Sequence, residues 1–81
     1  MRDEAAKKLK IVQNIIRARE RAGLSQAEAS ERLGKSKNFM SKVESLKRTV
    51  KAWELYDLAA AFNSDPRDLV EPPVSGRRPA K

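Results

Sequence analysis

Apolar residues recur at helical spacing through most of the first seventy positions of this chain. In residues 1–22, Leu9, Val12 and Ile16 fall on one face, with Ile15 and Arg19 beside them. A spacing of three to four residues predicts an amphipathic helix, and no stretch shows the strict alternation typical of a strand. The apolar pattern therefore predicts an all-α chain.

Capping residues divide the next segment into two short helices. Ser25 followed by Glu28 matches a capping box and opens a second helix that runs to about residue 33. Gly34 can adopt the left-handed conformation that ends this helix. Ser36 is the next N-cap candidate, for a third helix that extends to about residue 45. The inward face of this third helix is expected to be Phe39, Met40 and Val43.

Two further helices complete the expected fold. A fourth helix is expected over residues 52–62, with an apolar stripe formed by Trp53, Leu55, Tyr56, Leu58, Ala59 and Phe62. Asn63 can end it, and Asp65 with Pro66 can open a last short helix to Val70. Residues 1–71 thus form one compact domain of five helices. Residues 72–81 contain three prolines and little apolar content, which predicts a disordered basic tail.

The net charge of +7 is unevenly distributed along the chain. Residues 34–51 carry a net charge of +5, whereas residues 52–71 carry −4. A positive peak over one element is what polyanion binding predicts, although basic surface can also serve solubility alone. The chain has no cysteine and no histidine, so common metal ligands and general bases are missing. We therefore expect no enzyme activity, no metal site and no cofactor. Without a long apolar run or a signal-peptide pattern, we expect a cytoplasmic protein with no membrane partner.

A set of motifs between Arg17 and Leu69 sharpens this picture. They are Arg19, Leu24-Ser25-Gln26-Ala27-Glu28, Leu33-Gly34, Ser41-Lys42-Val43-Glu44 and Leu58-Ala59. Together they resemble the helix-turn-helix domain of the phage repressor and Cro family, also called the XRE family, over about two-thirds of the chain. The resemblance implies a five-helix repressor-like fold whose third helix enters the major groove of DNA.

The resemblance also implies roles for individual residues. The base-contacting residues would be Lys37, Asn38, Ser41 and Lys42. The phosphate-contacting residues would be Gln26, Lys35, Ser36, Ser45, Lys47 and Arg48. Arg19 and Glu44 would form a buried ion pair between the first and third helices. The alternative for the polar residues is an ordinary solvated helix surface.

Several positions depart from the family pattern. Ala29 replaces a core leucine, Ser30 replaces a small alanine, and Leu46 replaces the glycine after the third helix, which could alter the exit geometry. We expect Trp53 to fill the volume that Ala29 leaves open. Phe39 is expected to pack under the following connector, with contact to a thymine methyl as the alternative.

The expected function is that of a sequence-specific regulator of transcription that binds double-stranded DNA. It would be a bacterial or phage repressor that binds an inverted-repeat operator as a homodimer and acts by occupying it. The interface candidates are Tyr56, Ala60, Asn63, Pro66, Leu69 and Val70. The alternative is an adaptor or antirepressor that keeps the fold but binds a protein partner.

Overall fold

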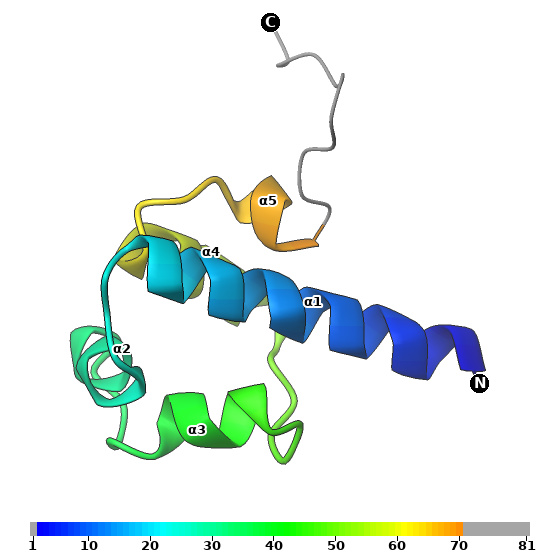
Figure 1. Ribbon diagram of the computed structural model, residues 1–81, viewed down its shortest axis with the longest axis horizontal. Coiled ribbons are helices and arrows are strands. Elements are labelled where there is room, and N and C mark those ends of the chain that lie inside the picture. The colour runs from blue at the N-terminus through cyan, green and yellow to red at the C-terminus, as the bar shows by residue number, and fades with distance from the viewer. Residues whose placement is uncertain (1, 71–81) are drawn as a thin grey trace, which may run out of the picture.

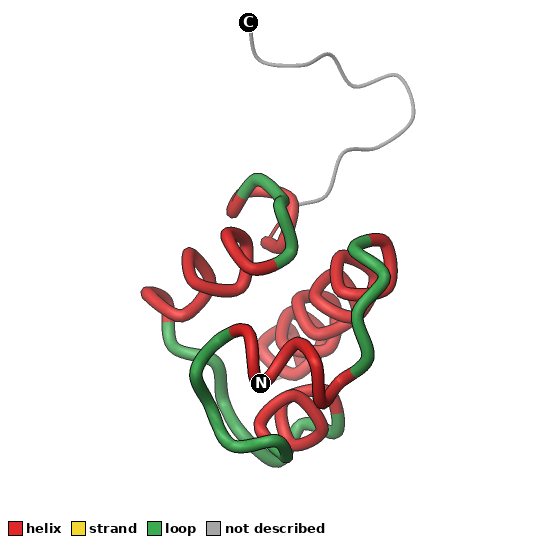
Figure 2. Tube along the Cα trace, turned by 90° about the vertical axis from the view of Figure 1, so that its left-hand side faces the viewer, coloured by secondary structure: helices red, strands yellow, loops and turns green. Residues whose placement is uncertain are grey.

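The computed structural model describes residues 2–70 of the chain, with side chains from residue 4 onward. Its elements are α1 (Arg2–Arg21), α2 (Gln26–Arg32), α3 (Phe39–Glu44), α4 (Ala52–Ala61) and α5 (Pro66–Val70). The described residues contain no strand, so the all-α prediction is confirmed (Figures 1 and 2). The tail expected over residues 72–81 lies outside the described part.

The long helix α1 organises the domain. It packs against α3 on one side and α5 on the other, while α2 packs against α3. In Figure 1, α1 runs along the long axis, with α3 below it, α5 above it and α4 behind it. Its first half extends beyond the other helices, so the core gathers around its second half.

The buried face of α1 is rotated from the face expected from the sequence. Val12, Ile15 and Ala18 are buried, whereas Leu9 is exposed and Ile16 is half-buried. Asn14 is also buried, and its Nδ2 donates a hydrogen bond of 2.9 Å to the backbone oxygen of Leu69. This bond gives a carbonyl of the last helix a partner that its own helix cannot supply.

The local signals that delimit α2 are confirmed. The backbone amide of Glu28 donates to Ser25 Oγ (3.0 Å), and that of Ser25 donates to Glu28 Oε1 (2.8 Å). These two bonds are the expected capping box. Gly34 has a φ of +73°, a conformation that a side chain would strain.

The start of α3 differs from the expectation. Ser36 is not its N-cap, because the helix begins at Phe39, and the N-cap position, Asn38, makes no side-chain cap bond. A buried side chain of α2 supplies a cap instead. Ser30 Oγ accepts a 2.9 Å bond from the backbone amide of Met40 and donates one of 2.9 Å to the backbone oxygen of Gln26. The hydroxyl at position 30 thus does more than fit in the space of an alanine, since it satisfies the first turn of the neighbouring helix.

The orientation of α4 contradicts the expected apolar stripe. Leu58 and Ala59 are buried as predicted, but Trp53 and Tyr56 are 65% and 66% exposed. The idea that Trp53 fills the space beside Ala29 is therefore wrong. The inward position in the first turn of α4 belongs to Glu54, which is buried because cationic groups surround it.

Candidate nucleic-acid interface

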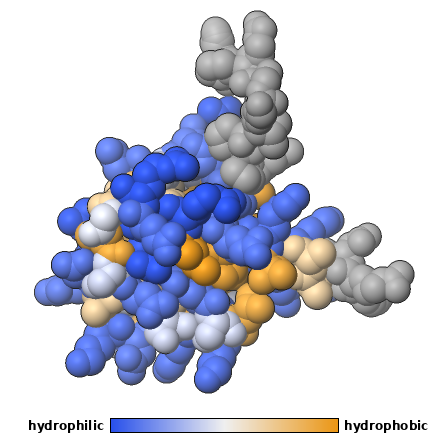
Figure 3. Space-filling view, viewed as in Figure 1, coloured by the Kyte–Doolittle hydropathy of each residue, from blue (hydrophilic) through white to orange (hydrophobic). Residues whose placement is uncertain are grey.

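The four residues expected to contact bases lie together on one exposed surface. Lys37 and Asn38 form the turn before α3, and Ser41 and Lys42 lie on the helix itself. All four are exposed. We call these four residues the α3 outer face. Hydrophilic side chains cover the edge of the molecule formed by α3 (Figure 3).

The opposite side of α3 is anchored in the core. Met40 and Val43 are fully buried, and Phe39 is 6% exposed. An apolar side chain that is buried to this extent holds its helix in one orientation, because turning the helix would return that surface to water. The α3 outer face is therefore presented outward on a rigid support.

A cluster of charges and an aromatic ring lies behind this surface. The carboxylate of Glu54 accepts from Arg48 Nη1 (2.8 Å) and Nη2 (3.0 Å), and Lys35 Nζ lies 3.7 Å from its Oε2. Arg48 and Lys35 also lie over the ring of Phe39, at 4.7 Å and 5.5 Å from its centroid. Hydrogen bonds from Arg48, helped by one from the Lys51 backbone amide, lower the pKa of Glu54 to about 2. Glu54 therefore ties the connector between α3 and α4 to the first turn of α4.

This cluster settles where Phe39 packs and changes the expected roles of Arg48 and Lys35. Phe39 packs beneath Arg48 and Lys35, so packing under the connector is confirmed and the ring is not displayed to a thymine methyl. The sequence predicts Arg48 and Lys35 at phosphates, yet in the structure both face Glu54. Sequence reasoning missed Glu54, which lies only six residues after Arg48, because the expected apolar stripe of α4 left no inward position for a carboxylate.

The predicted ion pair between Arg19 and Glu44 is confirmed. Arg19 Nε lies 2.7 Å from Glu44 Oε2, and the two side chains are only 12% and 7% exposed. Arg19 Nη1 also donates to the backbone oxygen of Leu24 (2.7 Å), just before α2. Gln26 Nε2 donates to Glu44 Oε1 at 2.8 Å. One carboxylate thus joins α1, the start of α2 and the end of α3.

The remaining expected phosphate ligands surround the α3 outer face. Ser36, Ser45 and Lys47 are exposed. Ser45 Oγ donates a long bond of 3.3 Å to the backbone oxygen of Lys42 at the end of the helix. Gln26 is half-buried, and its bond to Glu44 uses one of the two amide N–H donors. Nothing in the structure assigns a ligand to these groups, so their role at DNA stays a prediction.

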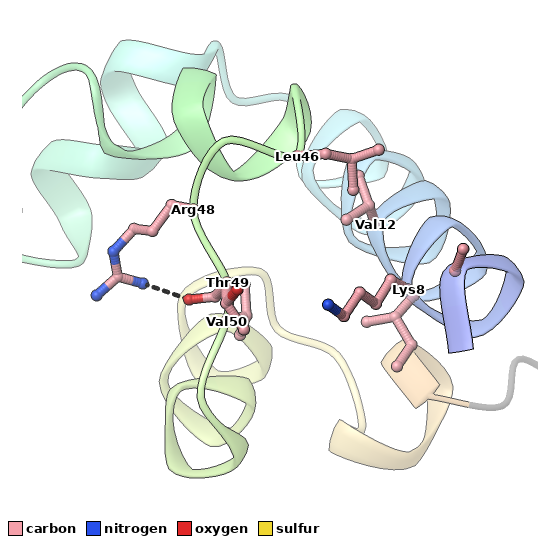
Figure 4. A pocket seen from close by; sticks show the side chains of 8 residues that line it. Lys8, Val12, Leu46, Arg48, Thr49 and Val50 are labelled. Carbon is pink, nitrogen blue, oxygen red and sulfur yellow. Dashed lines mark hydrogen bonds between the residues drawn. The ribbon is translucent and has the colours of Figure 1, made fainter. Parts of the chain in front are cut away.

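Leu46, which follows the C-cap residue of α3, keeps the geometry that glycine would provide. Its φ is +68°, in the left-handed region, and its side chain is 54% exposed. It lines an apolar groove of about 220 Å³ between α1 and the connector, together with Lys8, Val12 and Val50 among others. Figure 4 shows the Arg48 side chain directed away from α1, with its bond to the Thr49 oxygen. The groove is smaller than usual small-molecule sites of about 300–1,000 Å³.

Neither a metal-binding cluster nor a membrane-spanning helix is found among the described residues. No group of three or more Asp or Glu side chains there is arranged to hold a metal ion. None of the described helices is long and apolar enough to cross a membrane.

Comparison with known proteins identifies the family. A family model described as a helix-turn-helix domain matches residues 16–72, which is more than half of the chain. No curated protein and no solved structure matches the chain. The matched residues contain α2, the Gly34 turn and α3, together with the ion pair that fixes them. The chain therefore belongs to the helix-turn-helix domain family, which indicates a DNA-binding regulator.

Proposed function

We propose that this protein is a sequence-specific transcriptional regulator of the Cro/C1 repressor type that reads double-stranded DNA with the α3 outer face. The observation that carries the proposal is the contrast between the two sides of α3. One side is buried through Phe39, Met40 and Val43, and the other exposes two lysines, an asparagine and a serine. This arrangement presents polar donors outward on a helix that cannot rotate.

Each group on this face suits a base edge. A lysine can donate to O6 and N7 of guanine, and an asparagine can pair in two ways with adenine. In helix-turn-helix proteins the N-terminal residues of the second helix of the motif contact base edges. Lys37 and Asn38 lie in the turn directly before α3, which is the corresponding end. Ser41 and Lys42 would contact the next bases along the groove.

Phosphate contacts would fix the register of the helix in the groove. We assign them to Ser36, Ser45 and Lys47 and to the second N–H of Gln26, all at the margin of the α3 outer face. Arg48 and Lys35 are assigned a smaller share, because Glu54 already binds both. A phosphate near them would compete with that carboxylate for their donors.

Recognition of a whole operator requires two copies. One short helix reads only a few base pairs, which is too few to select one site in a genome. A two-fold dimer on an inverted repeat, with half-sites about 10 base pairs apart, doubles the recognised sequence. We propose that such a dimer represses transcription by occupying its operator.

Selection of bound duplexes from a random DNA pool at near-physiological salt tests this proposal. We expect enrichment of an inverted repeat. Lys37→Ala combined with Lys42→Ala should weaken binding to that repeat about 30-fold or more, since each good base contact contributes about 1–3 kcal/mol. Thermal melting should stay unchanged, because both side chains are exposed.

A charge-matched control separates base reading from general attraction. Arg21→Ala with Arg67→Ala removes the same charge from exposed positions on α1 and α5. This variant should keep the sequence preference. Equal losses in both double variants, or binding without enrichment, would overturn sequence reading by α3. No binding at all would favour a protein-interaction adaptor.

A further inference from the structure

The outward face of α4 is unusual for a solvent-exposed surface. The exposed positions of this helix are Ala52, Trp53, Tyr56, Asp57 and Ala60. Asp57 is the single charged residue among them, and the only other charged residue of α4, Glu54, is buried. A helix that is apolar on all sides normally has all its sides covered. Within the described residues, nothing covers this face of α4.

Two aromatic side chains dominate this face of α4. Trp53 and Tyr56 are one turn apart and about two-thirds exposed. Single exposed apolar residues are common, but aromatic residues grouped with alanines on one face are typical of an interaction site. We call Trp53, Tyr56, Asp57 and Ala60 the α4 outer face.

We infer that the α4 outer face binds the same face of a second copy of this chain, with the two α4 helices antiparallel. The inference rests on the proposed function, which requires two copies on one operator. It is carried by the order of side chains along the face. In a two-fold contact, residue i of one copy meets residue j of the other, and j meets i.

The side chains are complementary under this symmetry. Trp53 and Ala60 lie two turns apart, and the midpoint between them falls between Tyr56 and Asp57. Antiparallel pairing about that midpoint places the bulky Trp53 of each copy over the small Ala60 of the other. It also places the hydroxyl of Tyr56, a donor, beside the carboxylate of Asp57 of the other copy. A single register thus pairs Trp53 with Ala60 and the hydroxyl of Tyr56 with the carboxylate of Asp57.

The size of the face predicts a weak association. Fully buried aromatic side chains cover about 150–250 Å² each, so the two exposed portions would contribute roughly 300 Å² per copy. Standard interfaces bury about 800 Å² per partner. We therefore expect a dimer that forms at micromolar or higher concentrations in the absence of DNA.

The single tryptophan of the chain is a direct probe of this contact. Sedimentation equilibrium of the full chain without DNA should show a monomer–dimer equilibrium. The emission of Trp53 should shift to shorter wavelength over the same concentration range, because pairing removes the indole from water. A chain that stays monomeric up to about 0.5 mM, or an emission that does not change while dimers form, would overturn the inference.

A size exchange tests the register. Trp53→Ala and Ala60→Trp should each weaken dimerisation about tenfold or more, the first by loss of an anchor and the second by a clash of two tryptophans. The double variant restores one large and one small residue at each contact and should recover most of the affinity. Both positions are exposed, so folding of the monomer should not change. Ala60→Trp without effect, or no recovery in the double variant, would overturn the antiparallel pairing.

An equivalent change elsewhere provides the control. Leu9 is an exposed apolar residue on α1, away from α4, and Leu9→Ala should leave the dimer unchanged. Because these measurements omit DNA, their failure is separate from failure of the proposed function. A monomeric chain that still enriches an inverted repeat would leave DNA reading intact and reject this interface.

Discussion

Removing the carboxylate of Glu44 should destabilise the domain strongly. This carboxylate accepts from Arg19 Nε (2.7 Å) and Nη2 (3.2 Å) and from Gln26 Nε2 (2.8 Å). Glu44→Ala leaves a guanidinium charge that is only 12% exposed and an amide without its acceptor. Water cannot reach these groups freely enough to replace the lost partner.

The expected loss is a large part of the total stability. Breaking a buried ion pair by removing one partner costs about 3–5 kcal/mol. A domain of this size is stable by only roughly 4–10 kcal/mol. Because each kcal/mol moves the midpoint of a small domain by about 4–8 °C, Glu44→Ala should lower Tm by roughly 12–40 °C.

Circular dichroism melting and urea unfolding measure this loss directly. Glu31→Ala, on an exposed position of α2, is the matched control and should change stability by less than about 0.5 kcal/mol. A second test is a double-mutant cycle. Replacing both Arg19 and Glu44 by methionine should cost less than replacing Glu44 alone, since no unpaired charge remains. A Glu44→Ala variant that melts within about 4 °C of wild type would refute the reasoning.

Two further predictions concern Glu54 and Leu46. The pKa of Glu54 is about 2 in the folded state, below its ordinary value, so its contribution is complete above about pH 4.5 and disappears as the pH falls towards 2. That contribution is roughly 3 kcal/mol. Between pH 7 and pH 2.5, the free energy of unfolding measured in urea should fall more steeply for wild type than for Glu54→Gln. Equal slopes for the two proteins would contradict the prediction. Leu46 has a φ of +68°, so the Leu46→Gly variant should be more stable than the Leu46→Ala variant by up to about 1 kcal/mol. Thermal melting of the two variants measures this difference. At Ala27, an exposed helical position, the Ala27→Gly variant should instead be less stable than the protein with alanine. Glycine that is favoured, or disfavoured, at both positions would contradict backbone strain at Leu46.

Features set by neighbours in the chain can be predicted from the sequence. The capping box of Ser25 and Glu28 and the left-handed Gly34 depend on a few adjacent residues, and both are confirmed. The ion pair of Arg19 and Glu44 spans 25 positions and is predicted only through the family resemblance. The sequence places the start of α3 too early, because Ser36 looks like a cap, whereas the cap of Met40 comes from Ser30 on another helix.

The rotation of α4 shows why a hydrophobic pattern alone is insufficient. A stripe containing Trp53 and Tyr56 predicts that both are buried, since burying large apolar side chains normally stabilises a fold more than any other interaction. The structure buries Glu54 instead, and this is favourable only because Arg48 and Lys35 neutralise it. A carboxylate paired with Arg48, and more weakly with Lys35, thus faces the core in place of the aromatic residues. The aromatic residues on the other side remain exposed, where we propose that a second copy binds.

The same carboxylate changes how the basic segment can act on DNA. Residues 34–51 carry a net charge of +5 in the sequence, which suggests that all their cations are available to phosphates. In the fold, Arg48 and Lys35 contact Glu54 and lie over the ring of Phe39, so these cations stabilise the side of α3 that faces the core. Of the other lysines in this segment, those at positions 37, 42 and 47 are exposed on or beside α3, and Lys51 is exposed just before α4. Affinity for DNA should therefore depend mainly on Lys37, Lys42 and Lys47, whereas Arg48 should act mainly through the position of α3, which carries Lys42.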